Sequence, residues 1–448
     1  MNDPVLLWLR QDLRLHDQPA LVAAAHAGAV IPVYVLDDDG PGKWRMGAAQ
    51  RWWLHHTLAS LGEALEAKGS RLILRRGKAV PELRKLCDET GAEAIHAIRH
   101  YEPWWIEAER KLGDRLCLHD GNHLAPLRDV TTGSGGQYKI YSAFWRALSE
   151  RMPPEKPLAM PRSIPAPAKW PRSDTLKSWD LLPARPDWAK GFSADWMPGE
   201  DAALRKAADF VDEVGDYAAR RDLPQVEGTS RLSPHLHFGE LSPRTLWHKL
   251  DRGAQADKFR KELAWRDFTA NLLLVLPEYG DRNGRAAFDR MKWRNGASDL
   301  KAWQRGCTGY PIVDAGMRQL WATGWMHNRV RMIAASFLVK HLLIDWRKGE
   351  RWFWDTLVDA DYGNNSVNWQ WVAGTGVDSN MWGRIMTPLG QSKKFDAGDY
   401  IREWVPELRQ LGDDRIHDPQ DRPDGYPDKI IGHREARERA LAAGRAIR

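Results

Sequence analysis

The sequence predicts two folded regions, an N-terminal α/β region with a doubly wound parallel sheet and a mostly α-helical C-terminal region. Three observations carry this prediction. With 448 residues the chain is too long for one ordinary core. Up to about residue 130, short apolar runs alternate with helical patterns, which is the βαβ arrangement of a parallel sheet. Beyond about residue 200, strand signals vanish and long amphipathic patterns follow.

The predicted strands of the first region are four apolar runs. They read LLWLR, VIPVYVL, RLILRR and AEAIHAI, and helical patterns such as AAQRWWLHHTLASLGEALEAKG separate them. No GxGxxG follows the first run, so the usual dinucleotide fingerprint is absent. We expect an α/β domain over residues 1–130, a largely irregular connector over 131–199 and a helical domain over 200–448. The connector holds ten prolines between Pro153 and Pro198.

Composition limits the class of protein. The net charge is +6 and the pI is near 9.1, which fits a polyanionic partner such as DNA as well as simple solubility. No run approaches the roughly 18 to 20 apolar residues of a membrane span. The first residues lack the apolar core of a signal peptide, and the three cysteines are far apart. We therefore expect a cytoplasmic protein with no membrane partner, no disulfide framework and no metal site.

Tryptophan marks the candidate functional region. Ten of the 24 tryptophans lie between Trp293 and Trp382. Indoles are suited to passing single electrons and to stacking on flat bases.

A first motif, GTSRLSPHLHFGELSPRTLW, runs from Gly228 to Trp247 and contains two Ser-Pro steps. Serine at the N-cap followed by proline at the first helical position is a helix-start signature. Thr229, Ser230 and Ser233 would offer hydroxyls where a helix begins, a place that binds phosphate well. Two capped helices without a ligand would give the same pattern.

A second motif, KFRKELAWRDFTANLL, places Glu262, Trp265, Arg266 and Thr269 on one helical face. The face is polar and aromatic where a core face would be aliphatic. It suits a pocket that stacks and hydrogen-bonds a base, or else a solvated face with one stray indole.

A third motif, WMHNRVRM, puts Asn328 and Met332 four residues apart on one face, flanked by Arg329 and Arg331. Core packing is the alternative, although a polar first turn does not fit it.

The fourth motif, DADYGNNSVNWQW, predicts a polar loop of aspartates and asparagines ahead of Trp369 and Trp371. In a helix the two indoles would point about 200° apart, one toward a buried cofactor and one toward a cleft. A calcium loop is not expected, because the glycine and terminal glutamate of an EF-hand are missing.

Together these motifs, in this order, resemble those of the DNA photolyase/cryptochrome flavoprotein family. The likeness runs from LLWLRQDLRLHD to FDAGDYIREWVPEL and rests on TSRLSPHL, WRDF, TGYPIVDAGMRQL, HNRVRM and NNSVNWQW. The resemblance implies an α/β antenna domain and a helical domain that holds FAD. In photolyases, light excites FADH⁻, which gives an electron to a pyrimidine dimer in DNA, splits the dimer and takes the electron back.

The resemblance also implies roles for individual residues. Those implied to bind FAD are Tyr217, Thr229, Ser230, Arg231, Leu232, Ser233, Arg266, Arg331, Asp359, Asp361 and Asn365. Asn365 would lie beside flavin N5, and Arg331 would pair with an aspartate. Trp369, Trp346 and Trp303 resemble the inner, middle and surface members of the photoreduction chain. Those implied to contact the dimer-containing DNA are Glu262, Trp265, Asn328, Arg329, Met332 and Trp371, of which Glu262, Asn328 and Met332, with Asn365, are the catalytic candidates.

The antenna region departs from the family pattern. Trp44, Trp104 and Trp105 stand where folate-binding members carry other residues, so the second chromophore is left open.

Two functions are weighed against each other. A light-driven repair enzyme keeps the lesion-site residues, whereas a cryptochrome photoreceptor commonly loses them and carries a long C-terminal extension. This chain keeps them and stops soon after the family core, so we expect cyclobutane dimer repair by a monomer. Because Asn328 stands where (6-4) enzymes carry a histidine for proton transfer, (6-4) repair is not expected.

Overall fold

The computed structural model describes residues 3–379 and 382–447, which form two compact units. Within the described residues, the first unit comprises 3–187, 196–215 and 230–277, and the second comprises 188–195, 216–229, 278–379 and 382–447. Both units are therefore built from segments that alternate along the chain. The boundaries expected at residues 130 and 199 concern sequence regions and stay predictions.

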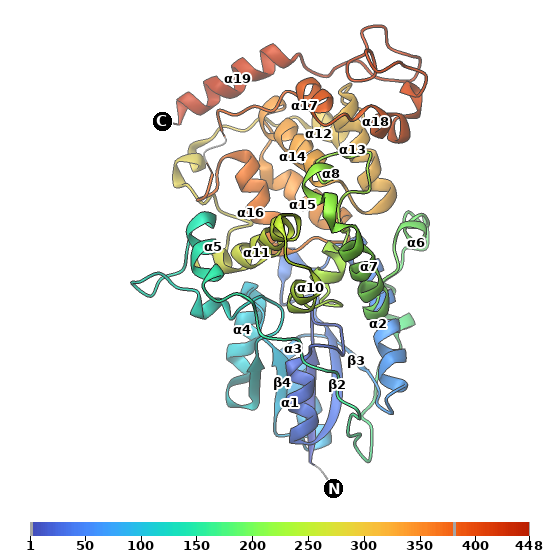
Figure 1. Cartoon of the computed structure of the whole chain (residues 1–448), viewed down its shortest axis with the longest axis vertical. Coiled ribbons are helices and arrows are strands. Elements are labelled where there is room, and N and C mark those ends of the chain that lie inside the picture. The colour runs from blue at the N-terminus through green and yellow to red at the C-terminus, as the bar shows by residue number, and fades with distance from the viewer. Residues whose placement is uncertain (1–2, 380–381, 448) are drawn as a thin grey trace. The chain divides into compact units, whose positions relative to one another are not determined.

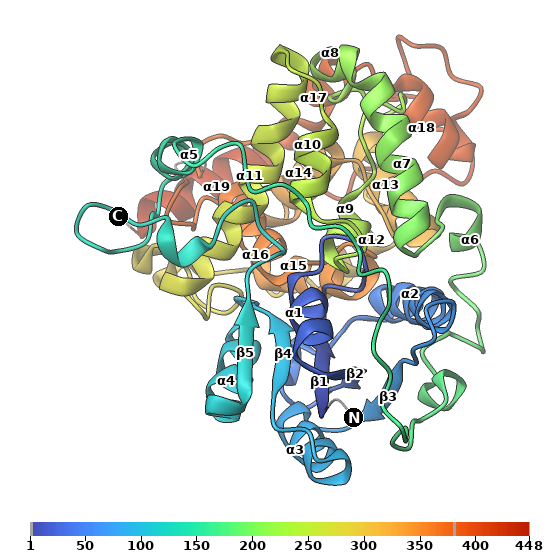
Figure 2. The same cartoon turned by 60° about the horizontal axis from the view of Figure 1, so that its bottom comes forward.

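A five-stranded, fully parallel sheet forms the centre of the first unit, in the order β3-β2-β1-β4-β5 (Figure 2). The strands are β1 (Pro4–Leu9), β2 (Ala29–Leu36), β3 (Ile73–Arg76), β4 (Ile95–Ile98) and β5 (Leu116–His119). The first four correspond to the four apolar runs predicted. Sequence reasoning missed β5, because this short edge strand is only partly buried and carries no continuous apolar run.

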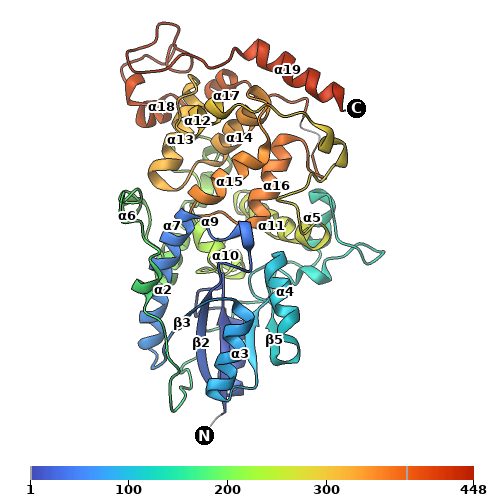
Figure 3. The ribbon, with the colours of Figure 1, turned by 180° about the vertical axis from the view of Figure 1, so that it is seen from behind.

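Helices cover both faces of this sheet, as a doubly wound fold requires. Helix α1 (Pro19–Ala27) lies in front of the sheet in Figure 1, and α3 (Ala79–Thr90) lies in front of it in the view from behind, Figure 3. Leu83 and Leu86 of α3, with Leu112 of α4 (Pro103–Leu112), pack against Leu6 and Ile31 of the central strands. The predicted α/β class of this region is confirmed.

The remaining helices divide between the units. The first unit also holds α2 (Ala48–Glu66), α5 (Tyr141–Ser149), α7 (Glu200–Glu213), α9 (Ser233–His237), α10 (Pro243–Lys249) and α11 (Ala254–Val275). The second unit holds α6 (Phe192–Asp195), α8 (Tyr217–Arg220), α12 (Ala297–Gln304), α13 (Pro311–Thr323), α14 (Asn328–Ser336), α15 (Trp346–Thr356), α16 (Tyr362–Ala373), α17 (Pro388–Lys394), α18 (Gly398–Trp404) and α19 (His433–Ala446). A π-helical turn, Phe337–His341, continues α14. Short 3₁₀ turns complete both units: Gly42–Trp44, Gly113–Arg115, Leu127–Asp129, Leu176–Trp179, Val214–Asp216, Ala286–Arg290 and Pro406–Leu408.

Among residues 3–379 and 382–447, no helix is both long and apolar enough to cross a membrane. The same residues hold no group of three or more His, Cys, Asp or Glu side chains arranged to bind a metal ion.

The buried carboxylate of Glu240 links three segments of the first unit: α2, the residue before α7, and α9. Its Oε1 accepts hydrogen bonds from Trp53 Nε1 (3.0 Å), from the Gly199 backbone N–H (2.8 Å), and from the Thr57 hydroxyl. His235 Nδ1 contacts the other oxygen of Glu240, which is completely buried. One acceptor group thus satisfies donors from three segments that are distant in sequence.

Replacing Glu240 with alanine should strongly destabilise the first unit, because its donors would be left buried without an acceptor. We expect Glu240→Ala to lower the free energy of unfolding by about 3–5 kcal/mol, measured by urea denaturation. Glu107→Ala, which removes an exposed carboxylate paired with Arg110, is the control. A Glu240→Ala protein no less stable than this control would contradict the role given to Glu240.

Candidate functional site

The residues predicted to act on a ligand are distributed over both compact units. The first unit carries Glu262, Trp265 and Arg266 on α11 and the segment 230–233 ahead of α9. The second carries Tyr217, Thr229 and the residues from Asn328 to Trp371 on α14, α16 and the turn before α16.

The two Ser-Pro steps begin two helices, but only one serine caps its helix. The Ser242 hydroxyl accepts a hydrogen bond from the Arg244 N–H (3.2 Å) at the start of α10, as predicted. The prediction for Ser233 is wrong, because α9 begins at Ser233 itself and Leu232 is its N-cap residue. Leu232 is completely buried. The start of this helix is therefore fixed by the packing of Leu232 and not by a hydroxyl cap.

The backbone just before α9 has an unusual conformation. Arg231 has a φ of +49°, in the left-handed region that non-glycine residues seldom adopt. Its guanidinium lies over the Trp196 ring at 4.5 Å, and the Ser230 hydroxyl accepts a hydrogen bond from the Leu232 N–H (3.3 Å). These contacts hold the segment in a fixed shape. In the second unit, Thr229 is half-buried, and Tyr217 opens α8 with the Arg221 guanidinium 5.0 Å from its ring.

Helix α11 presents the predicted polar and aromatic face. Glu262, Trp265 and Arg266 are half-buried, whereas Thr269 is buried and donates its hydroxyl to the Arg266 carbonyl (2.9 Å). The Arg266 guanidinium donates to the Leu236 carbonyl (3.1 Å) and to the Asn122 carbonyl. Arg266 thus joins α11 to two neighbouring segments of the first unit.

Helix α14 begins at Asn328, and the polar first turn of the motif has a structural reason. His327 is the N-cap residue, and its Nδ1 accepts a hydrogen bond from the Arg329 N–H (3.2 Å). Its Nε2 donates to the Arg221 carbonyl (3.0 Å), so the imidazole is neutral. Burial lowers the pKa of His327 to about 4. Asn328 itself is exposed.

The expected arginine–aspartate pair is present within the second unit. Arg331 and Asp359 form two parallel hydrogen bonds, Nη1 to Oδ1 at 3.1 Å and Nη2 to Oδ2 at 2.9 Å. Arg331 Nε also donates to the Met326 carbonyl (2.7 Å). This bidentate geometry fixes the turn before α16 against α14.

The polar phrase before the paired tryptophans is mostly helical. Helix α16 begins at Tyr362, and Asp361 caps it by accepting the Asn364 N–H (2.7 Å). The prediction that Asn364 and Asn365 lie in a loop is therefore wrong, because this cap starts the helix ahead of them. Trp369 and Trp371 both lie within this helix, the arrangement in which their indoles would point in different directions. Asn365 Nδ2 donates to the Glu350 carbonyl (3.0 Å), which orients its carbonyl oxygen as an acceptor.

The three tryptophans of the predicted electron-transfer chain are all buried in the second unit. Trp303 meets Trp369 edge-to-face at a centroid distance of 6.2 Å, and Trp346 donates its indole N–H to Asn283 (2.9 Å). The surface position expected for Trp303 is wrong. Its side chain has no exposed area, because its indole N–H donates to the Ala334 carbonyl (3.0 Å) and its ring stacks on Phe353.

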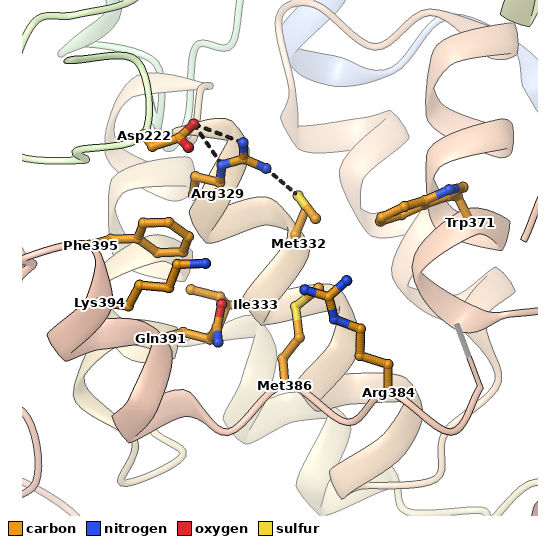
Figure 4. Close-up of a pocket in the computed structure, with 10 residues that line it drawn as sticks. All are labelled: Asp222, Arg329, Met332, Ile333, Trp371, Arg384, Met386, Gln391, Lys394 and Phe395. Carbon is orange, nitrogen blue, oxygen red and sulfur yellow. Dashed lines mark hydrogen bonds and ion pairs between the residues drawn. The ribbon is translucent and has the colours of Figure 1, made fainter. Parts of the chain in front are cut away.

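A pocket of about 250 Å³ opens beside α14 and α16 in the second unit (Figure 4). Arg329, Met332 and Trp371, all predicted site residues, line it. Arg329 Nε donates to Asp222 Oδ1 (2.8 Å), and its Nη1 lies 3.5 Å from the Met332 sulfur. A cation, a soft thioether and an indole therefore face one cavity.

Sequence reasoning missed several residues of this pocket. They are Asp222, Ile333, Arg384, Met386, Gln391, Lys394 and Phe395. No periodicity or spacing connects them to the motifs, because the chain between Arg384 and Phe395 returns to the pocket through a turn and the short helix α17. The adjacent basic residues Lys393 and Lys394 were a sequence feature that could have indicated an anion-binding surface here.

The tryptophans that alter the predicted antenna region lie in the first unit. Trp44 is buried, whereas Trp104 and Trp105 are half-buried on α4. Trp105 packs edge-to-face on Trp8 of β1 (5.7 Å), and the Arg10 guanidinium lies over the Trp8 ring at 4.2 Å. Trp105 thus forms part of the packing against the sheet.

Comparison with known proteins gives consistent results. The model for DNA photolyase matches residues 5–166, and the model for the FAD binding domain of DNA photolyase matches residues 259–446. A deoxyribodipyrimidine photo-lyase of Agrobacterium fabrum is 48% identical over 99% of this chain and 98% of the relative. The one of Escherichia coli is 38% identical over 99% and 98%. A crystal structure of a class III photolyase from Agrobacterium tumefaciens superposes with a TM-score of 0.95 at 48% identity, over 100% of this chain and 98% of the other.

Acid should destabilise the protein through His327. The unfolded chain binds a proton there below about pH 6.5, whereas the folded protein does so only near pH 4, so falling pH favours unfolding over this range. The stability lost would be up to about 3 kcal/mol. His327→Asn keeps a capping side chain but does not titrate. We expect its stability, measured by denaturant unfolding at pH 4.5 and 7, to fall less between these values than that of the native protein. Equal losses would contradict a neutral, buried His327.

Proposed function

The chain belongs to the DNA photolyase/cryptochrome family, and on this premise we propose that it repairs cyclobutane pyrimidine dimers in DNA, driven by blue light and with FAD as its cofactor. The observation that carries the proposal is the pocket lined by Arg329, Met332 and Trp371, because it joins a cation for a phosphate to apolar and aromatic surfaces for a base. The likeness to the class III enzyme supports placing the chain in that class.

The residues expected to hold FAD fit this cofactor chemically. The orientation of Asn365 leaves its carbonyl oxygen as an acceptor, which suits the N5–H of a reduced flavin. The left-handed backbone at Arg231 is a conformation found in phosphate-binding turns, and the Ser230 hydroxyl, which accepts the Leu232 N–H, has its own hydrogen to donate. Tyr217, Thr229, Leu232, Ser233, Arg266, Arg331, Asp359 and Asp361 complete the proposed FAD-binding set. When bound, FAD supplies the light-driven electron transfer, and the protein supplies position and electrostatics.

The proposed lesion contacts comprise apolar packing, a phosphate contact, hydrogen bonds and stacking. Met332 and Trp371 would pack against the apolar face of the dimer, and Arg329 would hold a neighbouring phosphate. In the first unit, Glu262 would accept hydrogen bonds from base N–H groups and Trp265 would stack on a flipped-out base.

The surroundings of Asn328 favour cyclobutane dimers over (6-4) products. The neighbouring His327 uses one ring nitrogen as a helix cap and the other on the Arg221 carbonyl. With its pKa lowered to about 4, His327 is a neutral imidazole at physiological pH, and it is therefore a poor general acid for a lesion. Asn328, the residue proposed for the lesion-facing position, does not titrate.

For the protein in the cell, we propose that it acts as a monomer in the cytoplasm. The three free cysteines, Cys87, Cys117 and Cys307, are compatible with a reducing compartment. Size-exclusion chromatography with light scattering would test the monomer, and fractionation of the source cells would test the compartment.

The decisive experiment exposes a dimer-containing oligonucleotide to the purified, FAD-loaded protein under blue light and counts the dimers lost. We expect loss of cyclobutane dimers in the light, none in the dark, and no loss of (6-4) products. A protein that binds FAD and responds to light but leaves cyclobutane dimers intact would instead be a cryptochrome-type photoreceptor.

Photoreduction of oxidised FAD should depend on Trp369, which has buried aromatic neighbours in Trp303 and Phe353. Phenylalanine is much harder to oxidise than tryptophan, so Trp369→Phe should abolish photoreduction by an external thiol, followed as bleaching of the flavin absorbance. Repair should persist when the flavin is reduced chemically beforehand. Undiminished bleaching in Trp369→Phe would require an electron-transfer route that avoids Trp369.

Substitutions at two residues of α11 should affect different quantities, the affinity for dimer-containing DNA and the rate of repair. Trp265→Ala should weaken binding to dimer-containing DNA by about 1–3 kcal/mol, the range for one stacking ring, measured by fluorescence anisotropy in the dark. Glu262→Ala should slow repair at saturating DNA. Lys258→Ala, a change four residues before Glu262 on the same helix, is the control. Unchanged affinity in Trp265→Ala would remove Trp265 from the lesion contacts.

A further inference from the structure

Trp265 has an aromatic neighbour that the proposed function does not use. The ring of Tyr141, the first residue of α5, lies flat on the Trp265 indole within the first unit. The ring centroids are 3.8 Å apart and the planes differ by 2°. Aromatic pairs prefer offset or edge-to-face arrangements, so the surrounding structure must hold these two rings face to face.

Two contacts hold Tyr141 in this position. Its hydroxyl donates a hydrogen bond to the Lys261 carbonyl of α11 (2.9 Å). The buried Phe268 presents an edge contact to both rings, at 5.6 Å from Tyr141 and 5.5 Å from Trp265. Burial, together with the negative charges of Glu262 and Asp267, raises the pKa of the Tyr141 hydroxyl, so it remains a donor at physiological pH.

The stack decides which side of Trp265 can receive a base. An indole has two faces, and a ring 3.8 Å from one of them leaves no room for a third ring between. Only the opposite face of Trp265 can then stack on a pyrimidine. The indole is also held in one plane before DNA arrives, so less side-chain freedom is lost on binding.

We propose that Tyr141 is a positioning residue for Trp265. Its ring covers one face of the indole, so that a pyrimidine dimer stacks on the opposite face. The inference rests on the proposed function, in which Trp265 contacts the dimer. It assigns Tyr141 a role in dimer recognition and none in the electron-transfer step.

The test compares three variants in the FAD-loaded protein. Tyr141→Leu removes the ring and the hydroxyl, and Tyr141→Phe keeps the ring but loses the hydrogen bond to Lys261. Tyr138→Leu is the matched control, because Tyr138 belongs to the same aromatic cluster through Phe144 and has no contact with Trp265 among the ring contacts of the described residues. Dissociation constants for dimer-containing and undamaged oligonucleotides are measured in the dark, with melting temperature and FAD content alongside.

We expect Tyr141→Leu to bind dimer-containing DNA about three- to tenfold more weakly, with unchanged affinity for undamaged DNA and an unchanged repair rate at saturation. Tyr141→Phe and Tyr138→Leu should bind like the native protein. The near-ultraviolet circular dichroism of the stacked rings should be lost in Tyr141→Leu and kept in Tyr141→Phe. If Tyr141→Leu loses FAD or fails to fold, Tyr141→Met, which fills the space with a flexible chain, is measured instead.

A double-mutant cycle separates positioning from general packing. In a Trp265→Ala background, Tyr141→Leu should weaken dimer binding no further, because the ring that it positions is gone. Three results would overturn the inference. Tyr141→Leu could lower only the melting temperature, it could weaken binding to damaged and undamaged DNA alike, or its effect on dimer binding could add to that of Trp265→Ala. A native protein with no preference for dimers would instead refute the proposed function, whatever the variants do.

Discussion

The bidentate pair between Arg331 and Asp359 is the interaction on which the second unit's candidate site depends. It joins α14, which carries Asn328 and Met332, to the turn that leads into α16. The Asp359 side chain is almost fully buried, so removing either partner would weaken the compensation of a buried charge. Because Asp361 then caps α16 two residues later, the pair also sets where that helix starts.

The position at which α16 starts determines which way its two tryptophans point, and their surroundings differ. Trp369 is buried against Trp303 and Phe353, whereas Trp371 lines the pocket. Gly349 on α15 makes this packing possible, because a Cβ atom there would lie 2.2 Å from the Trp369 ring. One helix therefore separates an aromatic interior suited to electron transfer from a cavity suited to a base, as its 3.6-residue period allows.

Sequence reasoning predicted the fold class, four of the five strands and the pairing of Arg331, because each depends on local pattern or on a long shared motif. It failed where packing decided the outcome. Leu232 anchors α9 where a serine cap was expected, and the burial of Trp303 follows from contacts with Ala334 and Phe353 that no spacing encodes. The pocket residues Arg384 and Lys394 were missed for the same reason, since tertiary folding alone brings them beside Met332.

The pairing of Arg329 with Asp222 has a consequence for the thermodynamics of DNA binding. Salt dependence arises when a protein cation replaces the small ions condensed around phosphates. The guanidinium of Arg329 already has a carboxylate within 2.8 Å, so a phosphate that approaches it must share this cation with Asp222. In the proposed DNA complex, the slope of affinity against salt concentration would therefore underreport the number of basic residues around the pocket. Arg329 would contribute more to the register of the DNA strand than to counterion release.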